Sequence, residues 1–270
     1  MIEGLLANVK EKAPLVHSIT NYVTVNDCAN ALLAVGASPI MADCPQEAAQ
    51  ITKISDALYI NIGTPGSESV SAMKKSGAAA KEKRIPVLLD PVGIGASDLR
   101  TKTAKEIVSE ITPQIIKGNI SEIKTLLNGC GRTNGVEARK EDCGSEDETV
   151  EIAKNLAKKT GAVIIITGVY DTVSDGAHTY IIRNGHKLMS RITGAGCMLG
   201  ALTSAFAGAN PEMLFEASAA AVMSFGICSE IAAGNMLAGE GSASFKTRLI
   251  DAIYNFDEKI LKEGQKYEMR

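Results

Sequence analysis

Short apolar runs alternate with longer helical patterns along most of this sequence, and that alternation limits the folds open to the chain more than any other feature. Five runs have the length and composition of buried strands: residues 38–41, 57–62, 87–90, 114–117 and 162–167. The clearest helical patterns lie between them: residues 23–33, 46–54, 67–83, 101–110 and 148–159. Strands that alternate with helices form βαβ units, and continuous apolar strands are typical of a sheet covered on both faces. The sequence therefore predicts an α/β fold with a doubly wound, mostly parallel sheet flanked by helices.

The later part of the chain follows a different pattern. Residues 178–183 and 186–189 flank an Asn184-Gly185 pair, which predicts a β-hairpin. Beyond it, residues 213–237 and 243–261 are predicted as two long helices that cover the sheet. The chain has no internal repeat and no obvious linker. We therefore expect residues 1–270 to form one domain, a length that α/β folds often reach as a single unit.

Composition excludes several classes of protein. A hydrophobic fraction of 45% with 22% charged residues is ordinary for a soluble globular protein. The formal net charge is −3 and no basic block occurs, so a nucleic-acid partner is not expected. The N-terminus lacks the order of a signal peptide, and we find no apolar run long enough to span a bilayer, so we expect a cytoplasmic protein without a membrane partner.

The six cysteines are scattered without any C-x-x-C pair, so the sequence indicates neither a zinc site nor a disulfide framework. A bridge between Cys130 and Cys143, which flank a polar loop, stays open as an alternative. Such a bridge would be unusual in a reducing compartment.

One glycine-rich turn precedes an apolar helical run. Gly194, Ala195 and Gly196 come directly before Cys197, and helix-forming residues follow. Backbone N–H groups left open where a helix begins, together with the helix dipole, form a site for an anion. The spacing matches neither the dinucleotide fingerprint G-x-G-x-x-G nor a P-loop. We interpret Gly194, Ala195 and Gly196 as an anion hole and Cys197 as a reactive residue whose thiolate the helix terminus favours.

Polar side chains follow the predicted strands, and carboxyl ends of parallel strands meet at one edge of a sheet. Asp90 ends one strand, and Glu122 lies in an Asn119-x-x-Glu122 pattern after another. Both carboxylates could hold Mg²⁺ largely through water, and Lys117 could meet a nucleotide phosphate. An anion cradle, acidic oxygens for a divalent cation and a group to orient a hydroxyl are what phosphoryl transfer needs.

Several stretches resemble one known family. They are residues 14–21, 32–42, 61–64, 89–96, 117–122, 166–168, 184–186 and 193–197. Together they make the sequence similar to the hydroxyethylthiazole kinases, a thiamine-salvage family of the ribokinase-like superfamily. The resemblance implies a three-layer α/β/α fold and ATP-dependent phosphorylation of 4-methyl-5-(2-hydroxyethyl)thiazole with Mg²⁺ required.

The same resemblance implies roles for individual residues. Substrate contacts fall on Met41, Gly194, Asn21 and Gly63, ATP contacts fall on Lys117, Thr167 and Asn119, and the metal region falls on Asp90 and Glu122. Many members carry Arg where Lys117 stands. The family also implies a homotrimer with sites between subunits, in which the Asn21 and Met41 segments would be interface as well as pocket.

Cys197 occupies the place where many relatives in the superfamily have Asp as the base. A free thiol has a pKa of about 8.5, so Cys197 needs a lowered pKa before it can act as a base at neutral pH. We therefore interpret Cys197 as a modest base or a positioning group.

Three alternatives remain at this stage. A sibling kinase acting on hydroxymethylpyrimidine would share the fold and the anion hole. Cys197 with His17 could form a thiol hydrolase, which would leave Asp90 and Glu122 without a role. A protein that binds the thiazole without consuming ATP is the third. His178 and His186, in the predicted hairpin, are expected to be structural.

Overall fold

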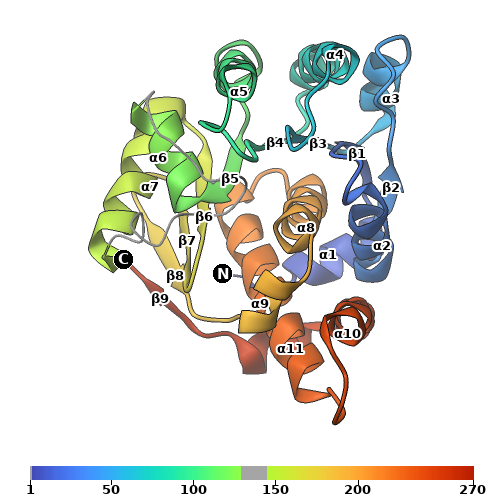
Figure 1. The fold of residues 1–270 in the computed structure, drawn as a ribbon, viewed down its shortest axis with the longest axis vertical. Coiled ribbons are helices and arrows are strands. Elements are labelled where there is room, and N and C mark those ends of the chain that lie inside the picture. Colours follow the sequence, from blue (N-terminus) through green and yellow to red (C-terminus); the bar gives the residue numbers. More distant parts are fainter. Residues whose placement is uncertain (1, 129–144) are drawn as a thin grey trace.

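The computed structural model describes residues 2–128 and 145–270. Within these residues, nine strands form one sheet in the order β2-β1-β3-β4-β5-β6-β7-β8-β9 (Figure 1). Their bounds are β1 (Leu15–Ile19), β2 (Ser38–Ile40), β3 (Ala57–Asn61), β4 (Val87–Asp90), β5 (Ile115–Asn119), β6 (Val163–Thr167), β7 (Asp171–Ser174), β8 (Thr179–Ile182) and β9 (Tyr267–Met269). Strands β1 to β6 run parallel, and β7, β8 and β9 extend the sheet in antiparallel fashion. The predicted α/β fold with a mostly parallel sheet is confirmed.

Helices cover both faces of the sheet (Figure 1). One layer contains α3 (Ala48–Ile54), α4 (Ser67–Lys83), α5 (Asp98–Ile111), α6 (Ile120–Asn128) and α7 (Glu146–Thr160). The other contains α2 (Val25–Val35), α8 (Ala195–Ala209) and α9 (Leu214–Gly234), with α1 (Leu5–Lys12), α10 (Ser242–Tyr254) and α11 (Glu258–Gly264) packed outside them. All five helices predicted between the early strands are present, with ends that differ from the predicted ones by at most three residues.

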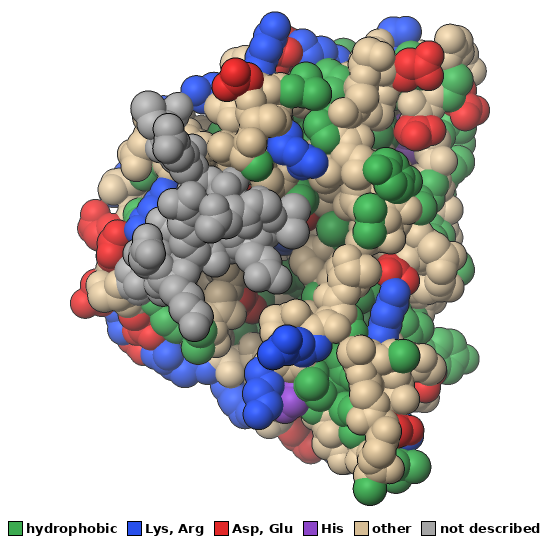
Figure 2. All heavy atoms as spheres, in the orientation of Figure 1, with side chains coloured by type: hydrophobic (Ala, Val, Ile, Leu, Met, Phe, Trp, Pro, Cys, Tyr) green, Lys and Arg blue, Asp and Glu red, His purple; other side chains and the backbone are tan. Residues whose placement is uncertain are grey.

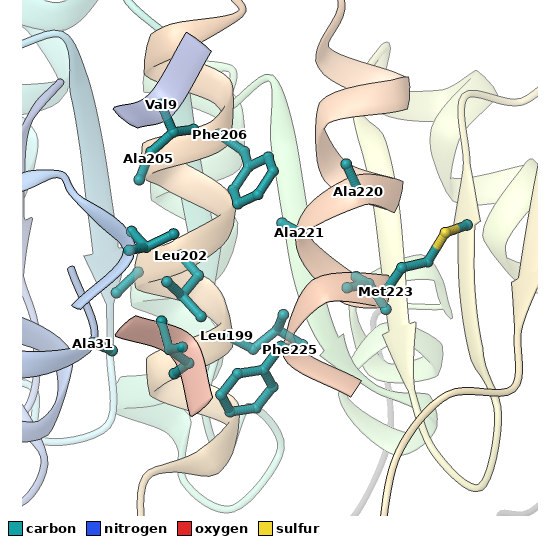
Figure 3. Close-up of a cluster of buried hydrophobic side chains, with 14 of the residues drawn as sticks. Val9, Ala31, Leu199, Leu202, Ala205, Phe206, Ala220, Ala221, Met223 and Phe225 are labelled. Atoms are coloured by element: carbon teal, nitrogen blue, oxygen red, sulfur yellow. The ribbon is translucent and has the colours of Figure 1, made fainter. Parts of the chain in front are cut away.

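The core lies on both sides of the sheet because successive strand residues point to opposite faces. Leu58 and Ile60 of β3 pack with α4 and α5, whereas Tyr59 between them packs toward α8. Figure 3 shows the larger cluster between α8 and α9, where Phe206 and Phe225 fill the space between the two helices.

Helix α9 corrects one expectation from the sequence. It is long and apolar enough to cross a bilayer, although no such run was expected. Within the protein, 78% of its most apolar 18-residue stretch is buried, as in the core helix of a globular protein. The helix is apolar on nearly all sides because α8, α10 and the strands surround it.

Strand β1 was not predicted, because His17 and Ser18 interrupt its apolar pattern. Both side chains are buried. The ring of His17 is accommodated by two hydrogen-bond partners, Thr52 Oγ1 at 2.8 Å and Ala42 O at 2.7 Å. A satisfied polar ring can occupy a buried strand position at little cost.

The predicted hairpin at Asn184-Gly185 is wrong. Strand β8 pairs with β7 and β9 instead, and residues Lys187–Arg191 form a 3₁₀ helix, η2. The β7–β8 turn is made at Asp175, whose Oδ1 accepts from the N–H groups of Ala177 at 2.8 Å and His178 at 2.6 Å. Asn184 instead bonds the C-terminal segment, through Gly264 O and Lys266 N, each at 2.9 Å.

Two other expectations from the sequence concern the last predicted helix and a disulfide bridge. The helix predicted for residues 243–261 is broken into α10 and α11, because Asp257 caps a new helix by accepting from the N–H of Ile260 at 2.8 Å. The alternative of a Cys130–Cys143 bridge lies outside the described residues.

Candidate active site

A pocket of about 880 Å³ opens where strands β1, β3, β4, β5 and β6 end and α8 begins. Its lining includes ten of the residues singled out in the sequence: Asn21, Gly63, Asp90, Lys117, Asn119, Glu122, Thr167, Gly194, Gly196 and Cys197. The parallel topology brings seven of them together, because each of these stands near or just after the end of a strand at the same edge of the sheet, and the start of α8 adds Gly194, Gly196 and Cys197. The structure thus brings these residues to one edge of the sheet, where the sequence indicated that they would lie.

Asp90 and Lys117 form a buried ion pair on the pocket floor. Lys117 Nζ lies 3.1 Å from Asp90 Oδ2, and the side chains are 4% and 2% exposed. Tyr59 Oη and Asn61 Nδ2 donate to the same oxygen at 3.0 and 3.2 Å. Burial raises the pKa of Asp90, while the ammonium group and these donors oppose that rise. Burial disfavours the charged amine too, but the charges of Asp90 and Glu122 raise the pKa of Lys117, which therefore stays a cation.

Glu122 is held by two backbone N–H groups, one from the loop after β4 and one from the end of β5. Its Oε1 accepts from Gly93 N and its Oε2 from Asn119 N, both at 2.8 Å. In return, Asn119 Oδ1 accepts from Glu122 N at 2.9 Å, a reciprocal pair that begins α6. Burial, with the negative charge of Asp90 added, raises the pKa of Glu122 to about 7. Two buried carboxylates that repel one another in a pocket favour a bound cation.

These carboxylates fit Mg²⁺ better than a transition metal. Among the described residues no three His, Cys, Asp or Glu side chains gather as a ready-made metal cage. Magnesium keeps several water molecules and is typically held by one or two carboxylates together with substrate phosphates. Asp90 and Glu122 match that requirement.

Cys197 is the third residue of α8 and contacts two amides. Asn21 Nδ2 and Asn61 Nδ2 lie 3.3 and 3.4 Å from its Sγ. Burial raises the pKa of the thiol, and the nearby charge of Asp90 raises it further. This corrects the expectation that the helix terminus favours the thiolate, because desolvation outweighs the donors around the sulfur. At neutral pH the group is a thiol.

Gly194 shapes the start of α8. It is the N-cap residue with φ of 87°, and as a glycine it has no side chain that could accept from the N–H groups of the first turn. A Cβ at this position would lie 2.8 Å from Thr24 Cγ2, so a side chain has neither a relaxed backbone nor space. The N–H groups of Ala195, Gly196 and Cys197 are in the first turn, where an α-helix offers its amides no internal acceptor. The geometry suits an anion, as the sequence indicated.

Two predicted residues are not among those that line the pocket. Met41 follows β2 and packs against the larger core cluster, and Ala195 lies in the first turn of α8 between Gly194 and Gly196, which do line the pocket. His17 uses both ring nitrogens for Thr52 and Ala42, so neither can take a proton from Cys197. The thiol hydrolase alternative therefore lacks its base. His178 and His186 are structural, as expected: His178 contacts Asp175 in a turn and His186 accepts from Leu188 N.

Sequence reasoning missed the part of the pocket that η2 supplies. Ser190, Arg191 and Thr193 line the mouth, together with Val23, Thr24 and Val92. Figure 2 shows lysine and arginine side chains beside a histidine over the segment between β8 and α8. Because residues 186–189 were predicted as a strand of the hairpin, this segment was not expected to line the pocket. Arg191, a cation that shortly precedes the anion-binding turn at Gly194, was the sequence signal that could have indicated it.

The chain is similar to known kinases in both sequence and structure. Residues 6–259 match the hydroxyethylthiazole kinase family. A protein named hydroxyethylthiazole kinase from Clostridium acetobutylicum is 46% identical over 271 residues, covering 99% of each chain. The solved structure of a hydroxyethylthiazole kinase protein from Pyrococcus horikoshii superposes with a TM-score of 0.90 at 37% identity, covering 100% of this chain and 98% of that one.

A more distant structure, the pyridoxal kinase of Staphylococcus aureus, shares the fold at a TM-score of 0.62 and 16% identity, over 95% of this chain and 98% of that one. The ribokinase-like fold expected from the sequence is therefore confirmed. With nearly the whole length matched and relatives above 40% identity, this chain belongs to the hydroxyethylthiazole kinase family.

Proposed function

We propose that this chain transfers the γ-phosphoryl group of ATP to the hydroxyl of 4-methyl-5-(2-hydroxyethyl)thiazole, giving the phosphate ester and ADP for thiamine biosynthesis by salvage. One observation carries the proposal. The start of α8 at Gly194, the thiol of Cys197 and the carboxylates of Asp90 and Glu122 share one pocket. This is the set of groups that phosphoryl transfer to an alcohol requires.

The reaction forms one bond and breaks one. The substrate oxygen attacks the γ-phosphorus, the bond from that phosphorus to the bridging oxygen of ADP breaks, and the hydroxyl proton is released. Negative charge spreads over the transferred group in the transition state. The N–H groups of Gly194, Ala195 and Gly196 stabilise that charge, because they are oriented by the helix before the substrate arrives.

Lys117, Asn119 and Thr167 are the proposed ATP contacts. All three line the pocket beside the two carboxylates. Lys117 presents a single ammonium group, so it meets a phosphate without the planar double contact of an arginine. Its ion pair with Asp90 fixes where that charge lies.

Asp90 and Glu122 are the proposed holders of Mg²⁺, largely through water. When bound, the ion neutralises phosphate charge. Glu122 is kept in place by the N–H groups of Gly93 and Asn119, and Asp90 by Lys117, Tyr59 and Asn61.

Cys197 is proposed to act on the substrate hydroxyl as a positioning group. Burial raises the pKa of its sulfur, so at neutral pH it is a thiol that already carries its proton and cannot take up another. In a loose transition state the hydroxyl needs no strong base, because it becomes strongly acidic only as its bond to phosphorus forms. Cys197, with Asn21 and Asn61 beside it, therefore orients the hydroxyl, and the proton passes to an oxygen of the transferred phosphoryl group.

Substrate contacts are proposed for Asn21, Gly63, Gly194 and Met41, and Met41 requires a second chain. It is not among the residues that line the pocket of its own chain. Tyr22 and Val23 beside the pocket are adjacent in the chain and 79% and 56% exposed, which leaves them available to the surface of a second chain. We propose a cytoplasmic homotrimer of one-domain subunits, with residues 1–270 as the domain and Met41 donated across each interface.

The test is ATP consumption by the purified protein with Mg²⁺, measured with hydroxyethylthiazole, with hydroxymethylpyrimidine and with neither. ADP release that requires the thiazole, with the phosphate ester detected by mass spectrometry, is the expected outcome. Release with the pyrimidine alone would assign the sibling kinase activity. Thiazole binding without ADP release would assign a binding protein. Chelation of Mg²⁺ by EDTA should abolish turnover, and excess Mg²⁺ should restore it.

A further inference from the structure

Arg100 links two loops of the pocket without lining it. Near the start of α5, its Nη1 donates to Ile62 O at 2.9 Å and to Val92 O at 2.7 Å, and its Nη2 donates to Gly63 O at 2.6 Å. The first and third carbonyls belong to the loop after β3, and the second to the loop after β4.

Each of the two carbonyls bound by Nη1 belongs to a peptide group whose N–H faces a pocket side chain. The peptide of Ile62 O contains Gly63 N, which donates to Asn61 Oδ1 at 2.9 Å. The peptide of Val92 O contains Gly93 N, which donates to Glu122 Oε1 at 2.8 Å. A planar peptide cannot turn its N–H without turning its carbonyl. One guanidinium nitrogen therefore fixes the direction of both N–H groups.

The two side chains held in this way have different tasks in the proposed reaction. Asn61 Nδ2 lies 3.4 Å from the sulfur of Cys197. This is the acceptor side of the pocket, where the hydroxyl that receives the phosphoryl group is proposed to lie. Glu122 is the carboxylate on the phosphate side. The distance between the acceptor side and the phosphate side must stay nearly constant, because a displacement of about 1 Å can lower the rate about 10²-fold.

The guanidinium geometry suits this role. Three carbonyls in different directions need several donors in a fixed plane, which arginine has and lysine lacks. Gly93 has φ of 70°, and a Cβ there would lie 3.2 Å from Arg100 Nη1. The β4–α5 loop therefore closes directly against the guanidinium.

We infer that Arg100 is a positioning residue that holds the acceptor-side and phosphate-side loops in register by orienting the Ile62–Gly63 and Val92–Gly93 peptide groups. The catalytic consequence rests on the proposed kinase function. The structural consequence does not, because it concerns two backbone N–H groups that can be observed without substrate.

The test compares Arg100→Ala and Arg100→Lys with Lys102→Ala, which removes a cation 76% exposed on the same helix. Amide hydrogen exchange at Gly63 and Gly93 is measured without ligands, and kcat and KM for the thiazole are measured separately. In both Arg100 variants we expect faster exchange at these two amides, kcat lowered about 10²-fold and a raised thiazole KM. Millimolar guanidinium ion should partly restore kcat in Arg100→Ala and leave Lys102→Ala unchanged.

Two results would overturn the inference. One is a folded Arg100 variant with wild-type kcat and thiazole KM, and the other is a loss of activity with unchanged exchange at Gly63 and Gly93. If Arg100→Ala does not fold, Arg100→Lys decides between the same results. If wild-type protein shows no thiazole-dependent ADP release, the proposed function fails, and the exchange measurement still decides whether Arg100 orients the two peptides.

Discussion

Lys117 Nζ lies 3.1 Å from Asp90 Oδ2 on the floor of the pocket, and the two side chains are 4% and 2% exposed. Neither charge can be removed alone without leaving the other buried and unpaired. The pair therefore links the stability of the sheet edge to the charge that the pocket offers a nucleotide.

Replacing Lys117 by Met should destabilise the protein strongly. The carboxylate of Asp90 would keep Tyr59 and Asn61 as donors but lose its only ion-pair partner among the described residues. Breaking one side of a buried pair typically costs about 3–5 kcal/mol. Urea denaturation measures the change, and Asp90→Asn in the Lys117→Met background should recover part of it. Lys262→Met, at a pair with Glu3 that is 68% and 67% exposed, is the control and should change the free energy of unfolding little. Similar free energies of unfolding for Lys117→Met and Lys262→Met would contradict this role of the buried ion pair.

Cys197 should matter to turnover by a modest factor. Cys197→Ala removes the thiol that orients the substrate hydroxyl, and we expect kcat to fall about tenfold, below the usual range for a well-matched general base. Cys197→Asp should keep or raise turnover, because Asn21 and Asn61 can donate to a carboxylate as they do to sulfur. Steady-state kinetics with saturating ATP measures both, with Cys44→Ala at an exposed cysteine as the control. Equal activity in Cys197→Ala and wild type would rule out the positioning role of this thiol.

Gly194→Ala should abolish most activity. The new Cβ would require a φ of 87° and would lie 2.8 Å from Thr24 Cγ2, so the first turn of α8 must shift. The backbone alone costs about 1–2 kcal/mol, and displaced amides should lower kcat by about 10²-fold or more. Gly234→Ala is the matched control, since a Cβ there meets nothing within 4 Å. A Gly194→Ala protein with wild-type kcat would mean that these amides do not act on the transferred group.

Many of the pocket residues could be placed together from the sequence, because they stand at strand ends and a parallel sheet collects strand ends at one edge. Asp90, Lys117 and Glu122 needed only the βαβ pattern to be placed together. The charge state of Cys197 could not be predicted in the same way. A helix terminus is visible in the sequence, whereas the burial that raises the thiol pKa comes from side chains distant in the chain.

The wrong hairpin has a related cause. Asn184-Gly185 is a strong local turn signal, but the amide of Asn184 is held by Gly264 and Lys266, about eighty residues further along the chain. Arg100 was missed for the same reason, since its partners at Ile62 and Val92 are carbonyls, which no sequence pattern distinguishes.

His17 should make stability depend on pH. Burial lowers its pKa below the ordinary value of 6.5, although the bond to Ala42 O opposes this shift. Above pH 6.5 the ring is neutral in both the folded and the unfolded chain, and its contribution to stability is complete. As the pH falls below that value, the unfolded chain takes up a proton that the folded ring resists, so this contribution is lost.

The measurement is the difference in free energy of unfolding between wild type and His17→Gln from pH 8 to pH 5. At high pH we expect wild type to be more stable by about 1–3 kcal/mol, because the substitution leaves Thr52 or Ala42 without its partner. The difference should narrow as the pH falls. Burial also raises the pKa values of Glu122 and Asp171 to about 7, which makes the folded protein more stable as the pH falls. Wild type and His17→Gln share both groups, so their contribution cancels in the difference between the two proteins. A difference that stays constant over the whole range would mean that His17 is protonated equally in the folded and unfolded chains.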